Sequence, residues 1–547
     1  MRHFRLIFAL VITCGLQSHA QTLSDLPLSH PLYDLLDRLE TRNIFAQTLL
    51  GVRPYSTSRI TDLIFRALGH DSLSNPEAIR LNRYRDSILG LRRTGSVDLR
   101  AGTIYSFNDS VLTMSVSPLF EQGLQRLDDE TQDSELVSQT LIGLSATGSF
   151  YKHFAFRVQH FEGREWGNRE RDDRSDVHRT PVETVQVKGK TVDFRESRYQ
   201  FRITLPWLDL DVGKESFDWG PSRERNIFLQ AESPSFVYSR LRVAHKRVSF
   251  QHLFGALRTR PGATNLGIAT IDNGHRRSLP SPKRYVAHRL GLAITDRMSL
   301  GIQESVVYGD RGFEPAYAIP ISILVGAQSY AGDTDNVAFG LDFSYRLKDQ
   351  AKLYGALFFD DLSKFDPGAF SNQVGIQGGA FVTDPLGLPN SDLRLEYVRL
   401  EPYTYAHNFG INTYTHFDGI LGHPVGPNAD RITLQVQGWL SPRIRVRSQV
   451  SRTREGDNYQ NGDELINVGG DVMQGRRPFD SPIRSFLAGD LTTITDLTLG
   501  VTFEASAALR FRLDGLISRQ EKRPAAGGAN ATNSSRSMAL ITELNAF

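Results

Sequence analysis

Alternation of apolar and polar residues with a period of two is the sequence feature that most limits how this chain can fold. Tyr199 and Phe201, for example, alternate with Gln200 and Arg202. Successive side chains of a β-strand point to opposite faces, so such a segment has one apolar and one polar face. Roughly 18 to 20 segments of about 9 to 11 residues follow this pattern, which is the length of a tilted transmembrane strand. The pattern predicts a mainly β fold, a transmembrane antiparallel β-barrel, over residues 96–547.

The connections between these segments alternate in length. The short ones cover residues 147–153, 295–298, 348–352, 441–443 and 505–507. The long, polar ones cover residues 162–197, 216–235, 259–283, 402–430 and 452–491. Short turns at one rim and long extracellular loops at the other are characteristic of outer-membrane barrels. A periplasmic sandwich or propeller gives less reason for this asymmetry and stays as the competing fold.

Residues 1–20 have the form of a cleaved signal peptide. Arg2 and Arg5 flank the start of an apolar run, residues 6–16, that is too short to span a bilayer, and small residues precede Gln21. Export and the strand pattern together predict the outer membrane of a Gram-negative bacterium. Lipidation of Cys14, the only cysteine, is the alternative to its removal with the leader.

Residues 21–95 carry helical patterns instead of alternation. A first helix is expected after Pro31, with leucines of residues 32–39 on one face. A second is expected to begin with Thr57 or Ser58 as its N-cap, and a third with Asn75 as its cap. Three short amphipathic helices predict a small N-terminal bundle that docks against a larger structure.

Composition excludes several classes of protein. The mean hydropathy is −0.31, and runs of about 20 apolar residues are missing, which excludes a polytopic helical membrane protein. The single cysteine excludes a disulfide framework and a cysteine-based metal cluster. Removal of Arg2 and Arg5 with the leader lowers the 63 basic residues to the number of acidic ones, 61. A neutral exported chain has no global electrostatic reason to bind nucleic acid.

The sequence carries no recognised catalytic motif. It lacks a nucleophile elbow, a zincin pair, a phosphate loop and a dinucleotide fingerprint. We therefore predict no catalytic residue, no metal site and no cofactor. A Ser/His/Asp site assembled in space from residues distant in sequence stays as an alternative, because the chain has 14 histidines and many acids.

Several segments resemble the Wzi-type capsule assembly family. Residues 30–39 and 53–56 are similar to its N-terminal region. Residues 212–222, Val-Gly-Lys-Glu-Ser-Phe-Asp-Trp-Gly-Pro-Ser, look like its central glycine-lysine…tryptophan-glycine-proline signature. Ser222 stands in place of the signature's second glycine, so ligand specificity should not be carried over.

The resemblance implies a barrel of about 18 strands with the helical bundle at its periplasmic side. It implies an outer-membrane protein that binds capsular or other surface polysaccharide and supports capsule assembly or attachment without catalysis. Outer-membrane lipid and the polysaccharide export machinery are further expected partners. A porin-like channel is the alternative function, followed by a barrel hydrolase.

Trp219 is the first candidate ligand contact. In the segment Trp219-Gly220-Pro221, a flat aromatic side chain precedes a backbone that can approach another group closely. The apolar face of a sugar ring packs on such an aromatic platform. A structural anchor is the competing interpretation, and the one we favour.

Two further groups of candidates lie in the expected long loops. Arg164 and Arg169 accompany Trp166 among several acids, and arginine forks recognise carboxylates such as those of acidic sugars. Mixed charge in a loop is more often solvated surface. The aromatic-rich stretch after residue 402 is also compatible with glycan stacking, and loop packing explains it at least as well. Its candidate residues are Tyr403, Tyr405 and His407.

Overall fold

The computed structural model describes most of the chain after the expected leader. The described residues are 24–45, 51–89, 97–98, 102–130, 132–151, 153–171, 174, 184–259, 267–272, 274–361, 372–417, 419–483 and 485–545. The expected signal peptide, with Cys14, lies outside them. None of the helices in the described part is long and apolar enough to cross a membrane.

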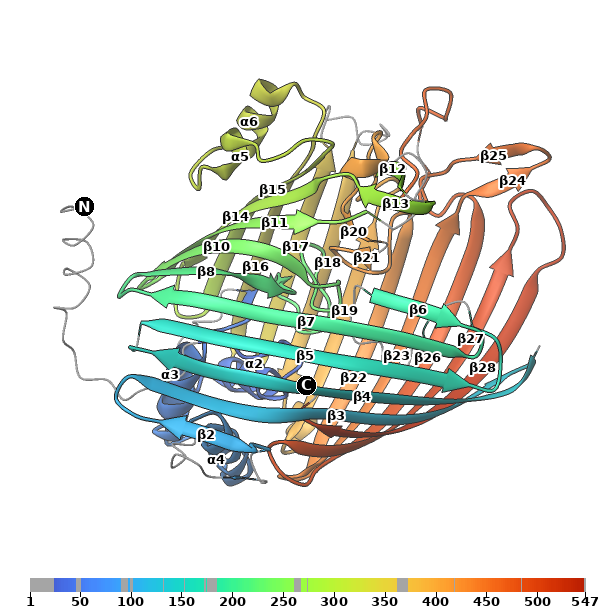
Figure 1. Ribbon diagram of the computed structural model, residues 1–547. Coiled ribbons are helices and arrows are strands. Elements are labelled where there is room, and N and C mark those ends of the chain that lie inside the picture. The colour runs from blue at the N-terminus through green and yellow to red at the C-terminus, as the bar shows by residue number, and fades with distance from the viewer. Residues whose placement is uncertain are drawn as a thin grey trace, which may run out of the picture.

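Within the described residues, 18 antiparallel strands form one closed barrel (Figure 1), which confirms the predicted fold class. β28 pairs with β3 and closes the ring, while the short strands β2 (Tyr105–Asn108) and β6 (Thr184–Lys188) lie beside it. The 18 strands are β3 (Leu112–Asp129), β4 (Gln132–Phe150), β5 (Phe154–Gly167), β7 (Thr191–Thr204), β8 (Leu208–Glu215), β10 (Phe236–His245), β11 (Val248–Leu257), β14 (Lys283–Ala293), β15 (Met298–Gly309), β16 (Asn336–Lys348), β17 (Ala351–Asp361), β18 (Gln373–Thr383), β19 (Ser391–Leu400), β22 (Ala429–Ser441), β23 (Ile444–Asp457), β26 (Asp490–Glu504), β27 (Leu509–Arg523) and β28 (Ala531–Leu544).

The period of two separates an apolar outer wall from a polar inner wall. On β16, for example, Phe339 and Phe343 are exposed on the outside of the barrel. Asp342 and Arg346 of the same strand are buried on the inside. An apolar exterior suits contact with lipid, and the polar interior must be compensated by whatever fills the lumen.

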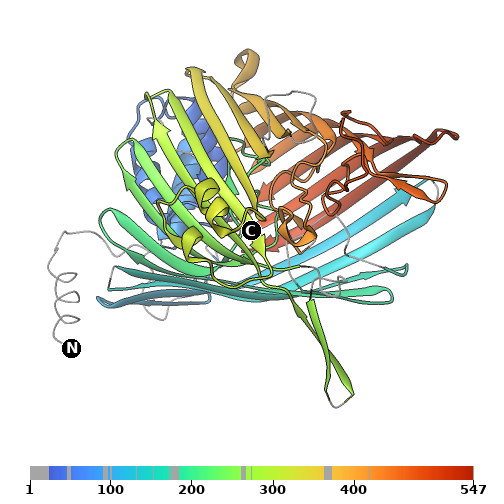
Figure 2. The same ribbon diagram turned by 90° about the horizontal axis from the view of Figure 1, so that it is seen from above.

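Most connections follow the predicted asymmetry, with short turns at one rim and long segments at the other; the exception is the step from β3 to β4, which is short although it lies at the long-loop rim. Figure 2 shows one of the long segments, the hairpin of β12 (Gly267–Asp272) and β13 (His275–Pro280), projecting away from the barrel. The expected loop of residues 162–197 is shorter than predicted, because β5 continues to Gly167 and β7 begins at Thr191.

Three helices form the predicted N-terminal bundle: α2 (Leu32–Thr41), α3 (Thr57–Leu68) and α4 (Asn75–Leu89). Leu36 of α2 and Ile64 of α3 are fully buried in its core. The N-cap of α3 is Ser56, one residue before the predicted cap, and its hydroxyl accepts a hydrogen bond from the Arg59 N–H at 3.4 Å.

The bundle lies against the short-turn rim of the barrel, where Arg38 of α2 joins three elements. Its guanidinium pairs with Glu77 of α4 at 2.8 Å and with Asp384, in the turn after β18, at 2.7 Å. It also pairs with Asp392 of β19 and donates to the Ser391 carbonyl at 2.9 Å. A buried arginine with this many partners fixes the bundle relative to the wall.

Asp37, the preceding residue of α2, makes a second connection to the wall. Its carboxylate accepts hydrogen bonds from Lys352 of β17 and, at 2.8 Å, from Arg394 of β19. Burial alone would raise the pKa of Asp37, but the two cations outweigh it and hold that pKa well below its usual value. The carboxylate is therefore charged and compensates two buried cations of the wall.

We predict that Asp37→Ala destabilises the protein by about 3 to 5 kcal/mol, because it removes the carboxylate that Arg394 pairs with and leaves buried Lys352 with Glu40 alone, at 3.3 Å. Asp62→Ala is the matched control, since Asp62 forms an exposed pair with Arg66 within α3. Such a pair contributes about 0.3 to 0.5 kcal/mol. Heat denaturation of the purified protein in detergent measures both effects, and equal midpoints for the two variants would contradict the prediction.

The same pair predicts a pH dependence. The pKa of Asp37 is lower in the folded protein than the ordinary value of 3.8, so its contribution to stability is present above that pH. It is lost as the pH falls below 3.8, when the unfolded chain takes up the proton first. Denaturation midpoints measured downward from about pH 6 should fall more steeply for the wild type than for Asp37→Ala.

Candidate functional site

The segment that follows β8 turns into the barrel instead of leaving it. Its strand β9 (Asp218–Trp219) pairs with β1 (Val52–Arg53), which follows the first helix. Arg53 Nε lies 2.8 Å from an Asp218 carboxylate oxygen, and Gly220 donates its N–H to the Gly51 carbonyl at 2.8 Å. The signature segment therefore joins the N-terminal region to the interior of the barrel.

Gly220 allows this close approach. Its φ is +138°, a conformation that side-chain-bearing residues rarely adopt, and a Cβ atom there would lie 2.2 Å from the Asn226 amide oxygen. Ser222, two residues further on, replaces the signature's second glycine; it is buried, and its hydroxyl donates to a Glu396 oxygen of β19 at 2.6 Å. The substitution thus adds a bond between the inward segment and the wall.

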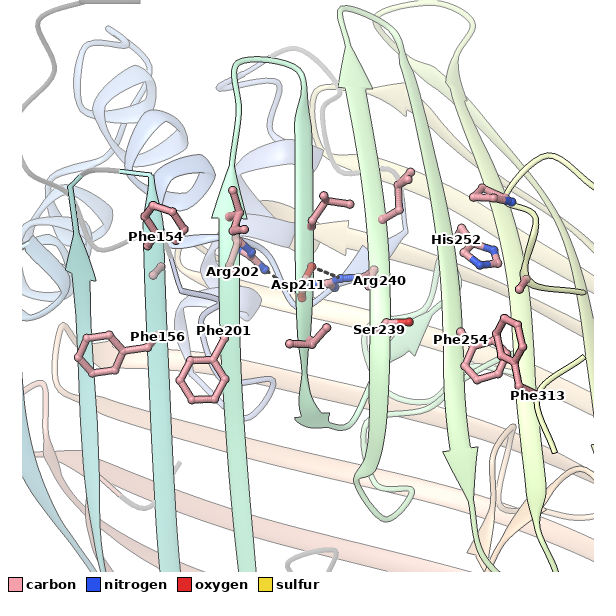
Figure 3. Close-up of a pocket in the computed structure, with 17 residues that line it drawn as sticks. Phe154, Phe156, Phe201, Arg202, Asp211, Ser239, Arg240, His252, Phe254 and Phe313 are labelled. Carbon is pink, nitrogen blue, oxygen red and sulfur yellow. Dashed lines mark hydrogen bonds and ion pairs between the residues drawn. The ribbon is translucent and has the colours of Figure 1, made fainter. Parts of the chain in front are cut away.

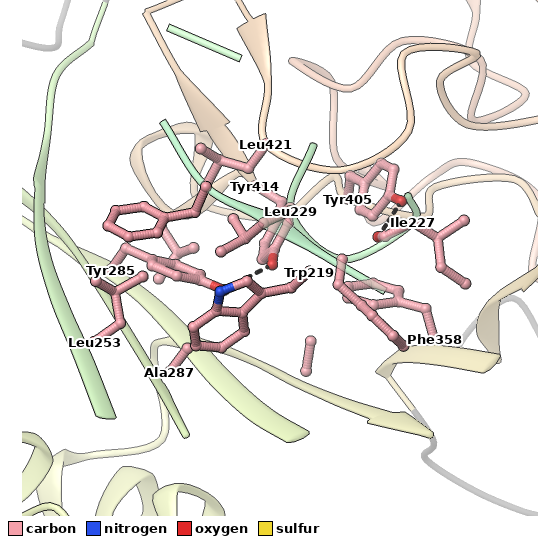
Figure 4. Packing of buried hydrophobic residues seen from close by; sticks show 14 of the residues in the cluster. Trp219, Ile227, Leu229, Leu253, Tyr285, Ala287, Phe358, Tyr405, Tyr414 and Leu421 are labelled. Carbon is pink, nitrogen blue, oxygen red and sulfur yellow. Dashed lines mark hydrogen bonds between the residues drawn. The ribbon is translucent and has the colours of Figure 1, made fainter. Parts of the chain in front are cut away.

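Trp219 is fully buried, and its placement favours the structural-anchor interpretation. Figure 4 shows its ring among Leu253 of β11 and Tyr285 and Ala287 of β14, all members of one buried cluster. In the structure the ring presents no face to solvent. Burial of a tryptophan in a packed core stabilises the inward segment through its large apolar area.

Tyr405 connects a second inward segment, residues 401–428, to the first. It is fully buried and stacks on Tyr414, with ring centroids 5.4 Å apart and planes inclined by 16°. Its hydroxyl donates to the Ile227 carbonyl at 2.6 Å (Figure 4). Burial raises the pKa of Tyr405, so the hydroxyl keeps its proton and remains a donor.

Tyr403 is nearly buried and forms one wall of a pocket of about 250 Å³ at the long-loop rim. Tyr403 and Tyr405 have φ values of +67° and +72°, which are costly for tyrosine and persist only where packing enforces them. The Tyr403 N–H donates to the Gly469 carbonyl at 2.9 Å, and its hydroxyl donates to the Asn467 carbonyl at 3.0 Å. Burial raises the pKa of Tyr403 to about 12.

The opposite wall comes from the connection between β23 and β26, which includes the hairpin of β24 (Tyr459–Asn461) and β25 (Glu464–Ile466). Arg477 donates to the Asp480 carboxylate from its backbone N–H at 2.7 Å and from Nε at 2.9 Å. Asn467 donates to the same carboxylate at 2.9 Å. These bonds fix the positions of three polar side chains around the pocket.

The hydrogen bonds around Asp480 keep its carboxylate charged. Burial favours the neutral form of Asp480, but the hydrogen bonds from Arg477 outweigh it and hold the pKa of Asp480 below its usual value. Phe479, between the two, is 72% exposed, and the Arg477 guanidinium lies 4.6 Å from its ring centroid. An exposed ring beside fixed hydrogen-bonding groups is the combination that binds a sugar, by stacking and by directed polar contacts.

The structure brings Tyr403 into this pocket but places the other predicted residues elsewhere. Arg164 and Trp166 lie on β5 and face outward, not in a loop as predicted; Arg164 pairs with Asp193 of β7 at 2.6 Å. Trp166 is 51% exposed. Arg169 is half-buried beyond the end of β5, and half-buried His407 accepts a hydrogen bond from the Phe409 N–H at 3.1 Å.

Sequence reasoning missed Arg477, Phe479 and Asp480, which lay in a stretch recognised only as a long polar loop. The available signal was the spacing of an arginine and an aspartate three residues apart, with Pro478 between them, which favours a turn that brings the two side chains together. Among the described residues, no group of three or more acidic, histidine or cysteine side chains is arranged to hold a metal ion.

A closed barrel with an apolar exterior, a helical bundle at the short-turn rim and inward segments packed in its lumen defines a plugged outer-membrane β-barrel. Residues 141–534 match the family described as capsule assembly protein Wzi. The chain therefore belongs to the Wzi capsule assembly family, which confirms the resemblance seen in its sequence.

Solved structures agree on the fold. Wzi of Escherichia coli, described as an outer membrane protein involved in group 1 capsule assembly and as a carbohydrate-binding β-barrel, matches with a TM-score of 0.55 and 14% identity. The match covers 95% of this chain and 99% of that chain. At this identity the likeness shows the fold alone.

Two other barrels match less well. OccAB2 of Acinetobacter baumannii has a TM-score of 0.44 and 10% identity, over 78% of this chain and 98% of its own. OprD of Pseudomonas aeruginosa has a TM-score of 0.41 and 11% identity, over 79% of this chain and 95% of its own. No curated protein sequence matches the chain.

We predict that Asp480→Asn loosens the pocket wall, because a neutral amide is a weaker acceptor for the Arg477 guanidinium and backbone N–H. Hydrogen exchange of residues 465–480, followed by mass spectrometry, should become faster than in the wild type. Asp463→Asn, at the exposed tip of the β24–β25 hairpin, is the control and should leave exchange unchanged. Equal protection in the Asp480→Asn variant and the wild type would contradict this role for Asp480.

Proposed function

We propose that the protein binds surface polysaccharide through the pocket beside Tyr403 and thereby supports the assembly or attachment of capsule. The observation that carries the proposal is the exposed Phe479 ring held next to the Arg477–Asp480 pair at the long-loop rim. Membership of the capsule assembly family and the carbohydrate-binding description of the Escherichia coli protein support it.

The charges of the pocket favour sugar hydroxyl groups over acidic sugars. Among the residues that the structure describes, its lining contains two carboxylates, Glu464 and Asp480, and one cation, Arg477. That cation is already engaged by Asp480 and by the Leu465 carbonyl at 2.7 Å. Carboxylate oxygens accept hydrogen bonds from hydroxyl groups and repel other carboxylates. A neutral residue of the polymer, stacked on Phe479, therefore fits this pocket best.

The remaining predicted residues take different roles in this proposal. Trp166, with Arg164 and Arg169 nearby, offers a peripheral contact on the outer surface of β5, because its ring is partly exposed. His407 adds a half-buried polar group on the segment that carries Tyr403. Buried Trp219 and Tyr405 position the inward segments without touching the polymer.

We further propose the predicted orientation and division of the chain: a leader, residues 1–20, a bundle, residues 21–95, facing the periplasm, and a barrel, residues 96–547, with its long loops outside the cell. In the bundle, Phe65 of α3 and Ile79 of α4 are exposed. Exposed apolar side chains on a domain at the periplasmic rim provide a contact surface for polysaccharide export machinery.

We propose that the protein acts without catalysis. Ser481 and Ser485 line the pocket, but among the described residues its lining includes no histidine to activate either hydroxyl. Asp480 is engaged by Arg477 and Asn467. These groups serve as hydrogen-bonding partners for a bound polymer.

Phe479→Ala should weaken binding of the purified protein to the cell's own capsular polysaccharide by roughly 2- to 10-fold, through loss of the stacking surface. In cells, polymer attached to the surface should fall while released polymer rises, as in a deletion strain. Phe409→Ala, an exposed phenylalanine outside the pocket, is the control. Normal attachment of polysaccharide to cells of the deletion strain would contradict the proposed function. Normal polysaccharide binding by Phe479→Ala would contradict only the assignment of binding to this pocket.

The filled lumen distinguishes this function from a porin-like channel. We predict that the wild-type protein gives no large, steady conductance in planar bilayers. Asp37→Ala should produce transient openings, because it loosens α2 from Lys352 and Arg394 of the wall. The exposed-pair variant Asp62→Ala should stay silent. A large, steady wild-type conductance would favour the channel alternative.

A further inference from the structure

The connection between β15 and β16 folds back over the outside of the barrel. We call residues 310–335 the outer flap; it contains α5 (Pro315–Ala318) and α6 (Leu324–Ala331), which Figure 1 shows beside the long-loop end of β15. On the outward face of β15, Ile302 is 38% exposed, whereas Val306 and Tyr308 are fully buried. The flap covers the wall at Val306 and Tyr308, since its Tyr317 and Leu324 pack with them in one buried cluster.

Directed bonds hold the outer flap in place. Glu304, also on the outward face of β15, accepts hydrogen bonds from the backbone N–H groups of Leu324 and Val325, both at 2.8 Å. These donors belong to the first turn of α6, where N–H groups have no partner within the helix. At the base of the flap, Asp335 accepts from the Tyr317 hydroxyl at 2.6 Å and from Arg311 at 2.9 Å.

The side of the outer flap that faces away from the barrel is apolar. From Pro315 to Gly332 the flap contains no charged residue. Ile321 is 85% exposed, and several other large apolar side chains are exposed with it. They are Ile319, Ile323, Val325 and Tyr330. Such a patch is unfavourable in water, and it adjoins a barrel wall whose apolar exterior is built for lipid.

A groove of about 760 Å³ lies between the outer flap and the outer wall of strands β5 to β11 (Figure 3). Phe313 forms its flap side and lies 5.6 Å, between ring centroids, from Phe254 of β11. Phe156 and Phe201 lie on its barrel side. The volume is within the range of ligand pockets, about 300 to 1,000 Å³.

The charged residues that border the groove are engaged within the barrel wall. Arg240 pairs with Asp211 at 2.7 Å and with Asp25 of the N-terminal segment at 2.6 Å. Arg202 pairs with Asp25 at 2.7 Å. Figure 3 shows Arg202, Asp211 and Arg240 grouped together, apart from the phenylalanine rings. The groove therefore offers hydrocarbon and aromatic surface, which suits an aliphatic chain and not a sugar polymer.

We propose that the outer flap is immersed in the outer leaflet of the membrane and that the groove beneath it holds an acyl chain of a membrane lipid. The groove is continuous with the lipid-facing wall, so a chain enters it without crossing water. Residues 315–332 of the flap carry no charged side chain to pair with a charged headgroup or an acidic protein partner. The flap thereby anchors the long-loop rim at a fixed depth, independently of polysaccharide binding.

A depth measurement tests the first half of the proposal. In a Cys14→Ser background, Ile321→Cys is labelled with an environment-sensitive fluorophore and the protein is reconstituted in phosphatidylcholine vesicles. Lipid brominated in its acyl chains should quench this label strongly. The control is Ile483→Cys, which is 73% exposed in the β23–β26 connection and should stay unquenched. Equal quenching at the two positions would overturn immersion of the flap.

Photo-cross-linking tests the groove. The photoreactive residue p-benzoylphenylalanine replaces Phe201 in the groove or, as a control, Phe343, which is exposed on the outer wall of β16 outside it. After extraction from phosphatidylcholine vesicles and detergent exchange, irradiation should give a lipid adduct at position 201 several-fold more often than at 343. Equal yields at both positions, or adducts to a second copy of the chain, would overturn the retained acyl chain.

Discussion

Compensation of buried charge on the inner wall is the constraint on which the rest of the structure depends. A closed barrel must turn every second side chain of each strand inward, and several of those side chains here are cations. Arg202 and Arg240 share Asp25 of the N-terminal segment, while Lys352 and Arg394 share Asp37 of α2. Uncompensated buried charges cost several kcal/mol each, so the barrel and its N-terminal region stabilise each other. The N-terminal region therefore supplies the negative charges that neutralise the buried cations of the barrel wall.

The contacts between the N-terminal region and the barrel wall also position the candidate site. Because β1 follows the first helix and pairs with β9, fixing the N-terminal region also fixes the inward segment that carries Trp219. Tyr405 then joins that segment to residues 401–428, and Tyr403, two residues away, forms the pocket wall. Each step uses buried packing or a directed hydrogen bond. The position of the pocket at the long-loop rim therefore depends, through a continuous series of contacts, on the charge pairs near the short-turn rim.

Local patterns in the sequence predicted the barrel and the bundle, because period two and period 3.6 are consequences of backbone geometry alone. The inward position of residues 216–235 was harder to predict, since a polar loop and an inward plug have similar compositions. Tyr403 and Tyr405 show the limit most clearly. They are two residues apart in the same aromatic stretch, yet one lines the pocket and the other is locked in the core by Ile227 and Tyr414. Contacts between residues distant in sequence decided their roles, and no local spacing records such contacts.

The outer flap compensates a charged group on the exterior of the barrel wall, as the bundle does on the interior. Glu304 occupies an outward position of a strand, where a carboxylate facing lipid would be unfavourable. The flap supplies two backbone N–H donors to that carboxylate and covers it with apolar residues. His288, on the outward face of neighbouring β14, is buried as well and lies 4.8 Å from His252 between ring centroids. On β14 and β15, the outward polar residues His288 and Glu304 therefore lie where the chain itself covers the wall.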